Sequence, residues 1–122
     1  MGKMKTFNVA GVFAKEHPVE TMRRIDKIAR YSSAGSTFGL VRDPSNEFDS
    51  NAIEVRQYFK SGASIRIGFV PNNKSRGNML ADELAPLMDN GWEPVVKFGR
   101  KFIDETTGEC RGLQLRYSLR AV

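Results

Sequence analysis

The chain has 122 residues, of which 40% are hydrophobic and 27% charged, a composition typical of a folded globular protein rather than a disordered or fibrous one. No apolar run approaches the roughly 20 residues of a membrane span, and the N-terminus lacks the apolar stretch of a signal peptide, so we predict one soluble, unexported, cytoplasmic domain over residues 1–122 without a membrane partner. Lys and Arg exceed Asp and Glu by 19 to 14, and the net charge of +5 is compatible with a polyanionic partner without specifying one.

In the first third of the chain, the pattern predicts a strand, a helix and a second strand. Residues 7–13 alternate in polarity, which predicts a strand. Residues 18–31 repeat apolar side chains at three- and four-residue spacing, which predicts an amphipathic helix with a basic outer face. Residues 37–42 predict the second strand, which ends at the turn-forming residues 43–46.

A hairpin and a second helical region follow. Residues 52–59 and 64–70 predict the two strands of the hairpin. The helical region opens at residues 71–73 and ends at residues 90–91, and Pro86 predicts either a kink or two short pieces. Its expected apolar stripe consists of Met79, Leu80, Leu84, Leu87 and Met88.

A final hairpin completes the predicted fold. Its strands are residues 92–103 and 111–120. The resulting order is β-α-β-β-β-α-β-β, a mainly β fold with two helices. Six evenly spaced strands favour a small closed or half-closed β-barrel.

The last hairpin contains basic and aromatic residues in alternation at residues 97–102. Such a segment can supply phosphate contacts and stacking platforms for a single strand, although an ordinary amphipathic strand shows the same pattern. Strict alternation puts Phe98, Arg100 and Phe102 on one face, whereas a bulge at Gly99 would exchange the faces of the later residues. Both arrangements remain open.

The turn after the second strand is acidic, and this suggests a different class of function. Asp43, Glu47 and Asp49 are hard oxygen ligands of the kind that a divalent-metal nuclease uses. A two-metal site would need further carboxylates, for which Glu54 and Asp82 are the candidates, and the calcium-loop glycine is absent. A turn with capping carboxylates is the simpler interpretation, so we predict no metal.

The chain has too few cysteine and histidine residues for several kinds of site. Cys110 is the single cysteine and His17 the single histidine. An internal disulfide, a Cys/His zinc site and a Cys-His or Ser-His-Asp catalytic arrangement are therefore ruled out. We expect no cofactor.

Three segments of the chain resemble the HIRAN domain family. They are residues 9–12, residues 40–55 and residues 67–71, and the second carries the string D-P-x-N-x-F-D-x-N-A-I, which is long enough to be a specific signal. The resemblance spans residues 7–103. It is to stand-alone bacterial and phage-type members and to the N-terminal DNA-end-binding domain of helicase-like transcription factor.

The resemblance implies an OB-like barrel that binds single-stranded DNA and, in its best-known members, captures a free 3′ end. It assigns Asp49 as acceptor of the terminal 3′-hydroxyl, with Phe48 as the adjacent aromatic and Asn46 beside it. Phe98 matches the family's stacking aromatic on a later strand. The implied partners are single-stranded DNA and a helicase or nuclease, in DNA repair or replication processing.

The residue chemistry agrees with these roles. An ionised Asp accepts hydrogen bonds but cannot donate them, so it pairs with a terminal hydroxyl and repels a continuing phosphate. Purely structural roles are the alternatives: a cap of the turn for Asp49, support of the loop for Asn46 and Asn51, and filling of the barrel for Phe48.

The chain also departs from the family. Where the DNA-end-binding members carry Arg-Tyr-Tyr on the first strand, residues 13–15 are Phe-Ala-Lys. Where they carry a His on the fourth strand, this chain has Phe69, whose alternation with Ile65 and Ile67 predicts a ring in the core. These departures weaken the expectation of 3′-end selectivity.

We predict a non-catalytic single-stranded-DNA-binding module. A protein-interaction or accessory module of a helicase or nuclease system, without nucleic-acid binding of its own, is the alternative. The predicted nucleic-acid-binding residues are Phe13, Lys15, Arg42, Asn46, Phe48, Asp49, Asn51, Lys97, Phe98 and Arg100.

Overall fold

The structure is a computed structural model that describes residues 4–11, 18–103, 106 and 110–121. Its element order is the predicted one, with a short 3-10 helix added before the second helix. The elements are β1 (Lys5–Asn8), α1 (Pro18–Ser33), β2 (Thr37–Arg42), β3 (Ile53–Tyr58), β4 (Ser64–Phe69), η1 (Lys74–Arg76), α2 (Leu80–Asp89), β5 (Trp92–Ile103) and β6 (Cys110–Ala121). The first strand is therefore displaced toward the N-terminus of its predicted range.

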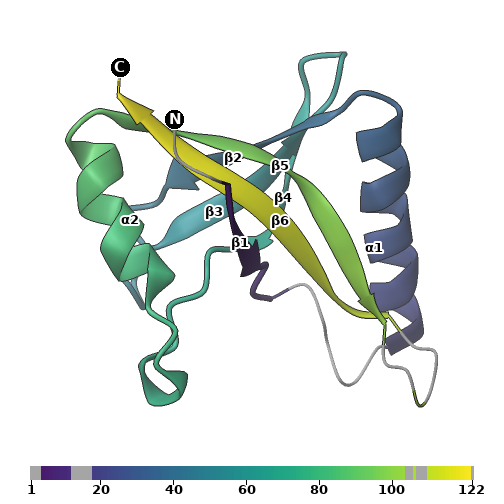
Figure 1. The fold of residues 1–122 in the computed structure, drawn as a ribbon, viewed down its shortest axis with the longest axis horizontal. Helices are drawn as coiled ribbons and strands as arrows, with labels where there is room; N and C mark the ends of the chain where they lie inside the picture. The colour runs from purple at the N-terminus through teal and green to yellow at the C-terminus, as the bar shows by residue number, and fades with distance from the viewer. Residues whose placement is uncertain (1–3, 12–17, 104–105, 107–109, 122) are drawn as a thin grey trace.

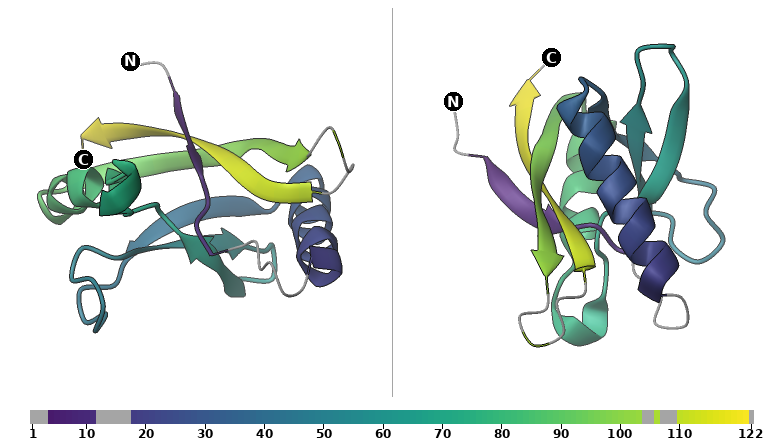
Figure 2. Two further views of the ribbon diagram at one scale, coloured as in Figure 1. Left: turned by 90° about the horizontal axis from the view of Figure 1, so that it is seen from below. Right: turned by 90° about the vertical axis from the view of Figure 1, so that its right-hand side faces the viewer.

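The six strands form one antiparallel sheet in the order β1-β6-β5-β2-β3-β4. The sheet bends into two layers, with β1, β5 and β6 in one and β2 and β3 in the other (Figure 2, left). The helices α1 and α2 lie at opposite ends (Figure 1). The predicted closed barrel is not confirmed, because within the described residues the edge strands β1 and β4 form no ladder with each other. The bridge from Ala10 to Phe69 links the two edges there.

The core lies between the two layers. Leu113 and Leu115 of β6 are fully buried and meet Ile53, Val55 and Ile67 from the opposite layer in one apolar cluster. Burying side chains of this size stabilises the fold by about 1.5–3 kcal/mol each. The alternation predicted for the last hairpin therefore places every second β6 residue inside.

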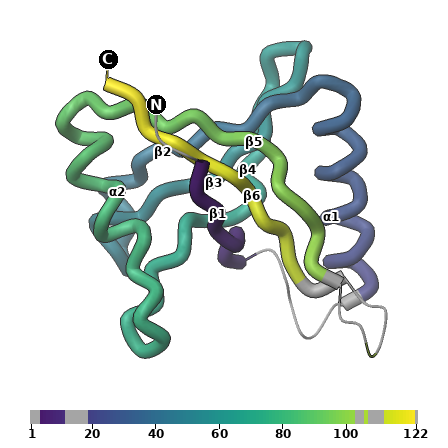
Figure 3. The backbone as a smooth tube through the Cα atoms, viewed as in Figure 1, coloured from purple at the N-terminus to yellow at the C-terminus, as the bar shows by residue number. Residues whose placement is uncertain are grey.

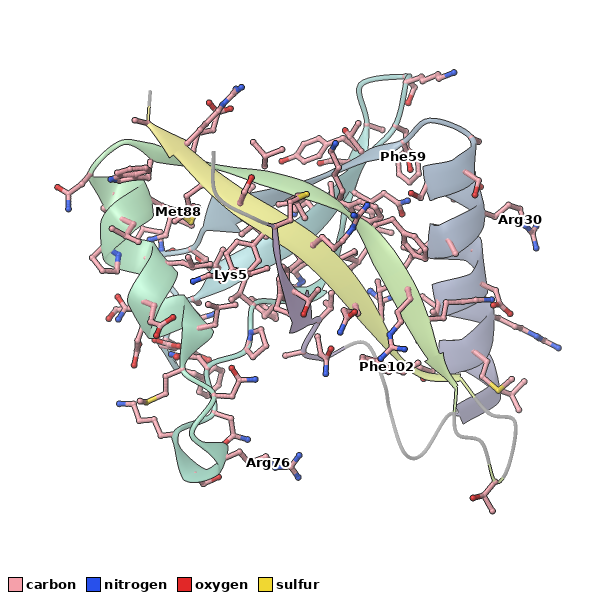
Figure 4. All side chains as sticks on the ribbon, viewed as in Figure 1. Lys5, Arg30, Phe59, Arg76, Met88 and Phe102 are labelled. Carbon is pink, nitrogen blue, oxygen red and sulfur yellow. The ribbon has the colours of Figure 1, made fainter. Side chains whose placement is uncertain are left out.

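Helix α1 closes one end of this core, as its periodicity predicts. Ile25 and Ile28 are buried, while the basic face points outward, as Figure 4 shows for Arg30. The buried Gln57 donates hydrogen bonds to the Ile28 carbonyl at 3.0 Å and to the Ser36 hydroxyl at 2.8 Å. A buried amide satisfied in this way joins the end of α1 to β3 without a desolvation penalty.

Helix α2 is shorter than the predicted helical region. Gly77 adopts a left-handed conformation with φ of 69° and ends η1, so the second helix starts only at Leu80. It continues through Pro86 as one helix. Ala81, Leu84 and Ala85 are the buried residues, and of the predicted stripe Met79 and Leu87 are exposed instead.

Two bulges change which side chains face the core. In β5 the register shifts between Phe98 and Arg100, so Gly99 is the extra residue. Its backbone runs so close to β6 that a Cβ at Gly99 would lie 2.6 Å from the Gln114 carbonyl oxygen. In β4 the register shifts opposite Val55 and Arg56, which leaves Ile67 as the extra residue.

The hairpin of β5 and β6 runs across the whole molecule from α2 to α1 (Figure 3). Figure 4 shows Met88 of α2 near one end of this ribbon and Phe102 near the other. Within the ranges that the structure describes, no helix has the length and apolar character needed to cross a membrane.

Candidate functional site

The loop of residues 43–52 between β2 and β3 is held by its own polar side chains. The Asn46 side-chain oxygen accepts hydrogen bonds from the backbone N–H groups of Phe48 and Asp49 at 3.0 and 3.1 Å, and its amide donates to Asp43 at 3.2 Å. At the base of the loop, the Asp43 N–H donates to the Ala52 carbonyl at 2.9 Å. The turn chemistry of this segment thus fixes the backbone on both sides of Phe48.

Arg42 secures the base of the same loop. Its guanidinium donates to the carbonyls of Ala52 at 2.9 Å and Ser50 at 3.1 Å. It also forms a bidentate pair with Asp89 at the end of α2, at 3.0 and 3.3 Å. The structure therefore places Arg42 as a support of the loop, and its proposed contact with a nucleic-acid backbone remains a prediction.

A network of amides and carboxylates ties the loop to the start of α2. The Asn72 side chain donates to Asp49 Oδ2 at 2.6 Å and to Asp82 Oδ1 at 3.1 Å, and Asn51 donates to the same Asp82 oxygen at 2.9 Å. The hydrogen bonds from Asn51 and Asn72 lower the pKa of Asp82, with a smaller contribution from the charge of Lys74 against an opposing effect of burial. Asp82 is therefore held ionised beneath the loop.

Phe48 projects from this fixed loop into solvent. Its side chain is 90% exposed, which excludes the role of filling the barrel. It stands at the edge of an open pocket of about 480 Å³, which is also lined by Asp49, Arg66, Phe69 and Asn72. The loop lies at the outer side of the layer that contains β2 and β3, away from β5 and β6 (Figure 2, left).

Phe69 is part of this pocket, and the prediction that its ring enters the core was wrong. The bulge at Ile67 breaks the alternation of β4, so Ile67 is buried while Ile65 is 49% exposed and Phe69 is half-buried. The Arg66 guanidinium lies over the Phe69 ring at 5.1 Å. The pocket thus combines two aromatic rings, one guanidinium and one carboxylate.

The basic and aromatic residues of β5 lie elsewhere. Phe98 is half-buried against the core and lines a separate pocket with Phe38 and Lys97. The bulge at Gly99 turns Arg100 to the outer face, so strict alternation was the wrong one of the two arrangements. The structure therefore does not bring Phe98 and Phe48 together in one pocket.

Two predicted residues, Phe13 and Lys15, lie outside the described residues. Asn51 and Asn46 are described, and both are engaged in the loop's own hydrogen bonds.

The metal-nuclease alternative requires a cluster of metal ligands. Across residues 4–11, 18–103 and 110–121, with residue 106, no group of three or more His, Cys, Asp and Glu side chains is placed to hold a metal ion. The Asn72 amide donates to the carboxylates of both Asp49 and Asp82.

The chain is similar to the HIRAN domain of human HLTF. The match to that crystal structure has a TM-score of 0.42 and 24% sequence identity, and it covers 93% of this chain and 74% of the other. This is the family that the loop motif resembles. No family model and no curated protein matches the chain.

Sequence reasoning missed three residues of the pocket and its support. Asn72 was assigned only to the start of a helical region, Asp82 only to a conjectural metal site, and Arg66 to no role at all. The signal available for Asn72 and Asp82 was an amide in a Pro-Asn-Asn turn followed by an acid in the first turn of a helix. Nothing in the sequence indicated that both would meet the acidic loop.

Proposed function

We propose that this chain is a non-catalytic module that binds single-stranded DNA and that the pocket beside Phe48 receives the terminal nucleotide of a free 3′ end. The observation that carries the proposal is the 90% exposure of Phe48 on a loop whose backbone is fixed by internal hydrogen bonds. Burying a large apolar side chain is favourable by about 1.5–3 kcal/mol, and an exposed ring gains this free energy only when a bound base covers it. Because the loop backbone is already fixed, less conformational entropy is lost when the ring binds a base.

The neighbouring groups suit a nucleotide. Stacking on an aromatic ring contributes about 1–3 kcal/mol per base and is tolerant of sequence, because every base has a π-face. Phe48 offers such a ring, and Phe69 lies in the same pocket beneath the Arg66 guanidinium. Arg66 therefore places a positive charge where a phosphate of the strand would enter.

Asp49 supports the selection of an end. One carboxylate oxygen accepts from the Asn51 N–H at 2.9 Å and the other from Asn72 at 2.6 Å, so the group is held in one orientation at the pocket. Each oxygen keeps a further lone pair for a 3′-hydroxyl. A 3′-phosphate in the same place would meet like charge. A module of this selectivity would serve DNA repair or replication steps that begin at a free end.

Fluorescence anisotropy with a short single strand tests the stacking ring. We expect Phe48→Ala to weaken binding by about 5- to 150-fold, the equivalent of one lost stack of 1–3 kcal/mol. The matched control is Ile65→Ala, which removes an exposed apolar side chain outside the pocket and should leave affinity unchanged. Equal affinities for wild type and Phe48→Ala would contradict the site.

The role of Asp49 is tested with strands ending in 3′-hydroxyl and in 3′-phosphate. We expect wild type to prefer the hydroxyl by about tenfold or more, since a charge-assisted hydrogen bond contributes roughly 1.5–3 kcal/mol. Asp49→Asn removes the charge, and its single oxygen keeps only one of the two hydrogen bonds from Asn51 and Asn72, so it should abolish the preference and also loosen the loop. Equal binding of both strands by wild type would refute end capture and leave general binding standing.

A protein-interaction module is the second candidate, and a different surface favours it. Tyr31 of α1 and Ile65 of β4 are 40% and 49% exposed and line an apolar pocket of about 400 Å³ together with Phe59. This candidate predicts no binding of single-stranded DNA even at low salt, where phosphate contacts are strongest.

A further inference from the structure

The outer face of the β5–β6 hairpin has a one-sided charge. Among the described side chains of β5 and β6, four cations and one acid occupy outward positions: Lys97, Arg100, Arg116 and Arg120, against Glu93. The alternation of β6 identifies the residues of the outer face. Leu113 and Leu115 are fully buried, so the neighbouring residues Gln114 and Arg116 point outward. Their partners Arg100 and Lys97 point outward with them and are exposed.

Within this face, two cations are direct cross-strand partners. Lys97 stands opposite Arg116, an arrangement that destabilises an antiparallel pair. Arg116 donates to the Phe98 carbonyl at 3.3 Å, and among the described residues neither side chain has a carboxylate partner. The protein thus keeps an unfavourable charge pair at the centre of its longest hairpin.

The same hairpin shows what a compensated pair looks like. Toward the other end, Glu93 and Arg120 are also cross-strand partners and form an ion pair at 2.9 Å. Lys101 lies on the inner face and pairs with Asp26 of α1 at 2.8 Å. On the described outer face of β5 and β6, the cations without a carboxylate partner are therefore Lys97, Arg100 and Arg116.

This stretch matches a phosphate backbone better than unstacked bases. The nearby aromatic ring, Phe102, is covered on one face by the Arg100 guanidinium at 4.7 Å. Single-strand binding depends on free stacking surfaces, whereas a duplex presents its bases stacked inside and a dense row of phosphates outside. Cations fixed on paired strands can neutralise such a row without any base contact.

We propose that the outer face of β5 and β6, centred on Lys97, Arg100 and Arg116, is a second surface that holds the phosphate backbone of duplex DNA. It lies on the opposite layer from the Phe48 pocket (Figure 2, left). The proposal rests on the proposed function only in taking DNA as the ligand, and its residues are independent of that pocket.

The test is a salt titration with a short blunt-ended duplex whose 3′ ends carry phosphate, so that neither overhang nor free 3′-hydroxyl is present. We expect salt-dependent binding by wild type, and we expect Lys97→Gln and Arg116→Gln each to reduce the slope of log affinity against log salt by about one. Arg120→Gln changes net charge equally but removes a paired cation, so it should leave the slope near the wild-type value.

Two further readouts separate this proposal from the pocket. Phe48→Ala should leave duplex binding unchanged while weakening single-strand binding. Lys97→Gln should also raise the melting temperature of the free protein, because it relieves the repulsion with Arg116, so a loss of binding would not reflect misfolding. Absence of duplex binding by wild type, or equal slope losses for Arg116→Gln and Arg120→Gln, would overturn the proposal. Duplex binding without single-strand binding would refute the pocket and leave this face standing.

Discussion

The loop at Phe48 and the outer face of β5 and β6 use polar groups in opposite ways. In the loop, carboxylates, amides and Arg42 bond to one another, and an apolar ring is left in solvent. On the β5–β6 face, apolar side chains are buried and, among the described residues, Lys97, Arg100 and Arg116 have no carboxylate partner. A site for stacking therefore needs a scaffold that satisfies its own polar groups, whereas a site for phosphates needs charge that the protein leaves uncompensated.

Among the variants that test the difference between these two regions, Gly99→Ala should have the largest effect on stability. The new Cβ would lie 2.6 Å from the Gln114 carbonyl oxygen, a backbone atom that can move only with β6. We expect a loss of about 1–3 kcal/mol in the free energy of unfolding, measured by urea denaturation. Duplex binding should fall with it, while single-strand binding at the loop should survive in the folded fraction.

Gly112→Ala is the control for that change. A Cβ there would meet the Phe102 side chain at 3.3 Å rather than backbone, so the neighbour can yield. A similar stability loss for both variants would show that the bulge at Gly99 has no special role.

Asn72→Ala should act on the other region. It removes hydrogen bonds to Asp49 and Asp82 and leaves the two carboxylates without the amide between them. We expect a loss of about 1–2 kcal/mol in unfolding free energy, because the groups are partly solvated. Single-strand affinity should fall as the loop loosens, and duplex affinity should not.

Asn8→Ala is the matched control for the amide, since the Asn8 side chain makes one long contact with Gln114 at 3.5 Å. An Asn72 variant as stable and as active as the Asn8 variant would contradict the anchoring role.

A smaller effect of opposite sign is expected for Lys97→Gln. Relief of the like-charge pair with Arg116 should raise the unfolding free energy by about a few tenths of a kcal/mol at low salt. High salt should erase the gain, because exposed charges are screened. A destabilised variant would mean that Lys97 has a favourable partner in the free protein.

The smallest effect should appear in the pH dependence of stability. The pKa of Asp82 is lowered from its ordinary 3.8 in the folded state, so the unfolded state binds the proton more readily. This stabilisation is present above pH 3.8 and is lost as the pH falls through the lower folded-state pKa. Acid titration of Asp82→Asn should show a shallower loss in this window than wild type, and identical profiles would assign the acid sensitivity elsewhere.

The sequence predicted the elements and their order because each depends on local periodicity and turn chemistry. Strand β2 and helix α1 are strongly periodic, and α1 extends its predicted range by one half-turn to Ser33. The failures concern residues whose placement depends on a neighbouring strand. The glycine beside the bulge at Ile67, Gly68, was not used as a signal, so strict alternation was assumed and Phe69 was assigned to the core.

Of the candidate site, the loop motif located Phe48 and Asp49, and the glycine at residue 99 raised the bulge as one of two alternatives. What could not be predicted was which distant segments meet these residues. Asn72 and Asp82 reach the loop only because α2 packs beside the end of β2, where Arg42 also contacts Asp89. Hydrogen bonds between side chains that are distant in the sequence produce no periodic pattern from which they could be predicted.

The pairing of β1 with β6 has a consequence for how the protein is made. As the chain emerges during synthesis, residues 5–8 have no ladder partner until residues 114–117 have followed. The hairpins β2–β3 and β3–β4 close over short loops and can form earlier, since nearby segments meet faster than distant ones. Assembly should therefore proceed from the middle of the chain outward, with the first strand waiting for the last.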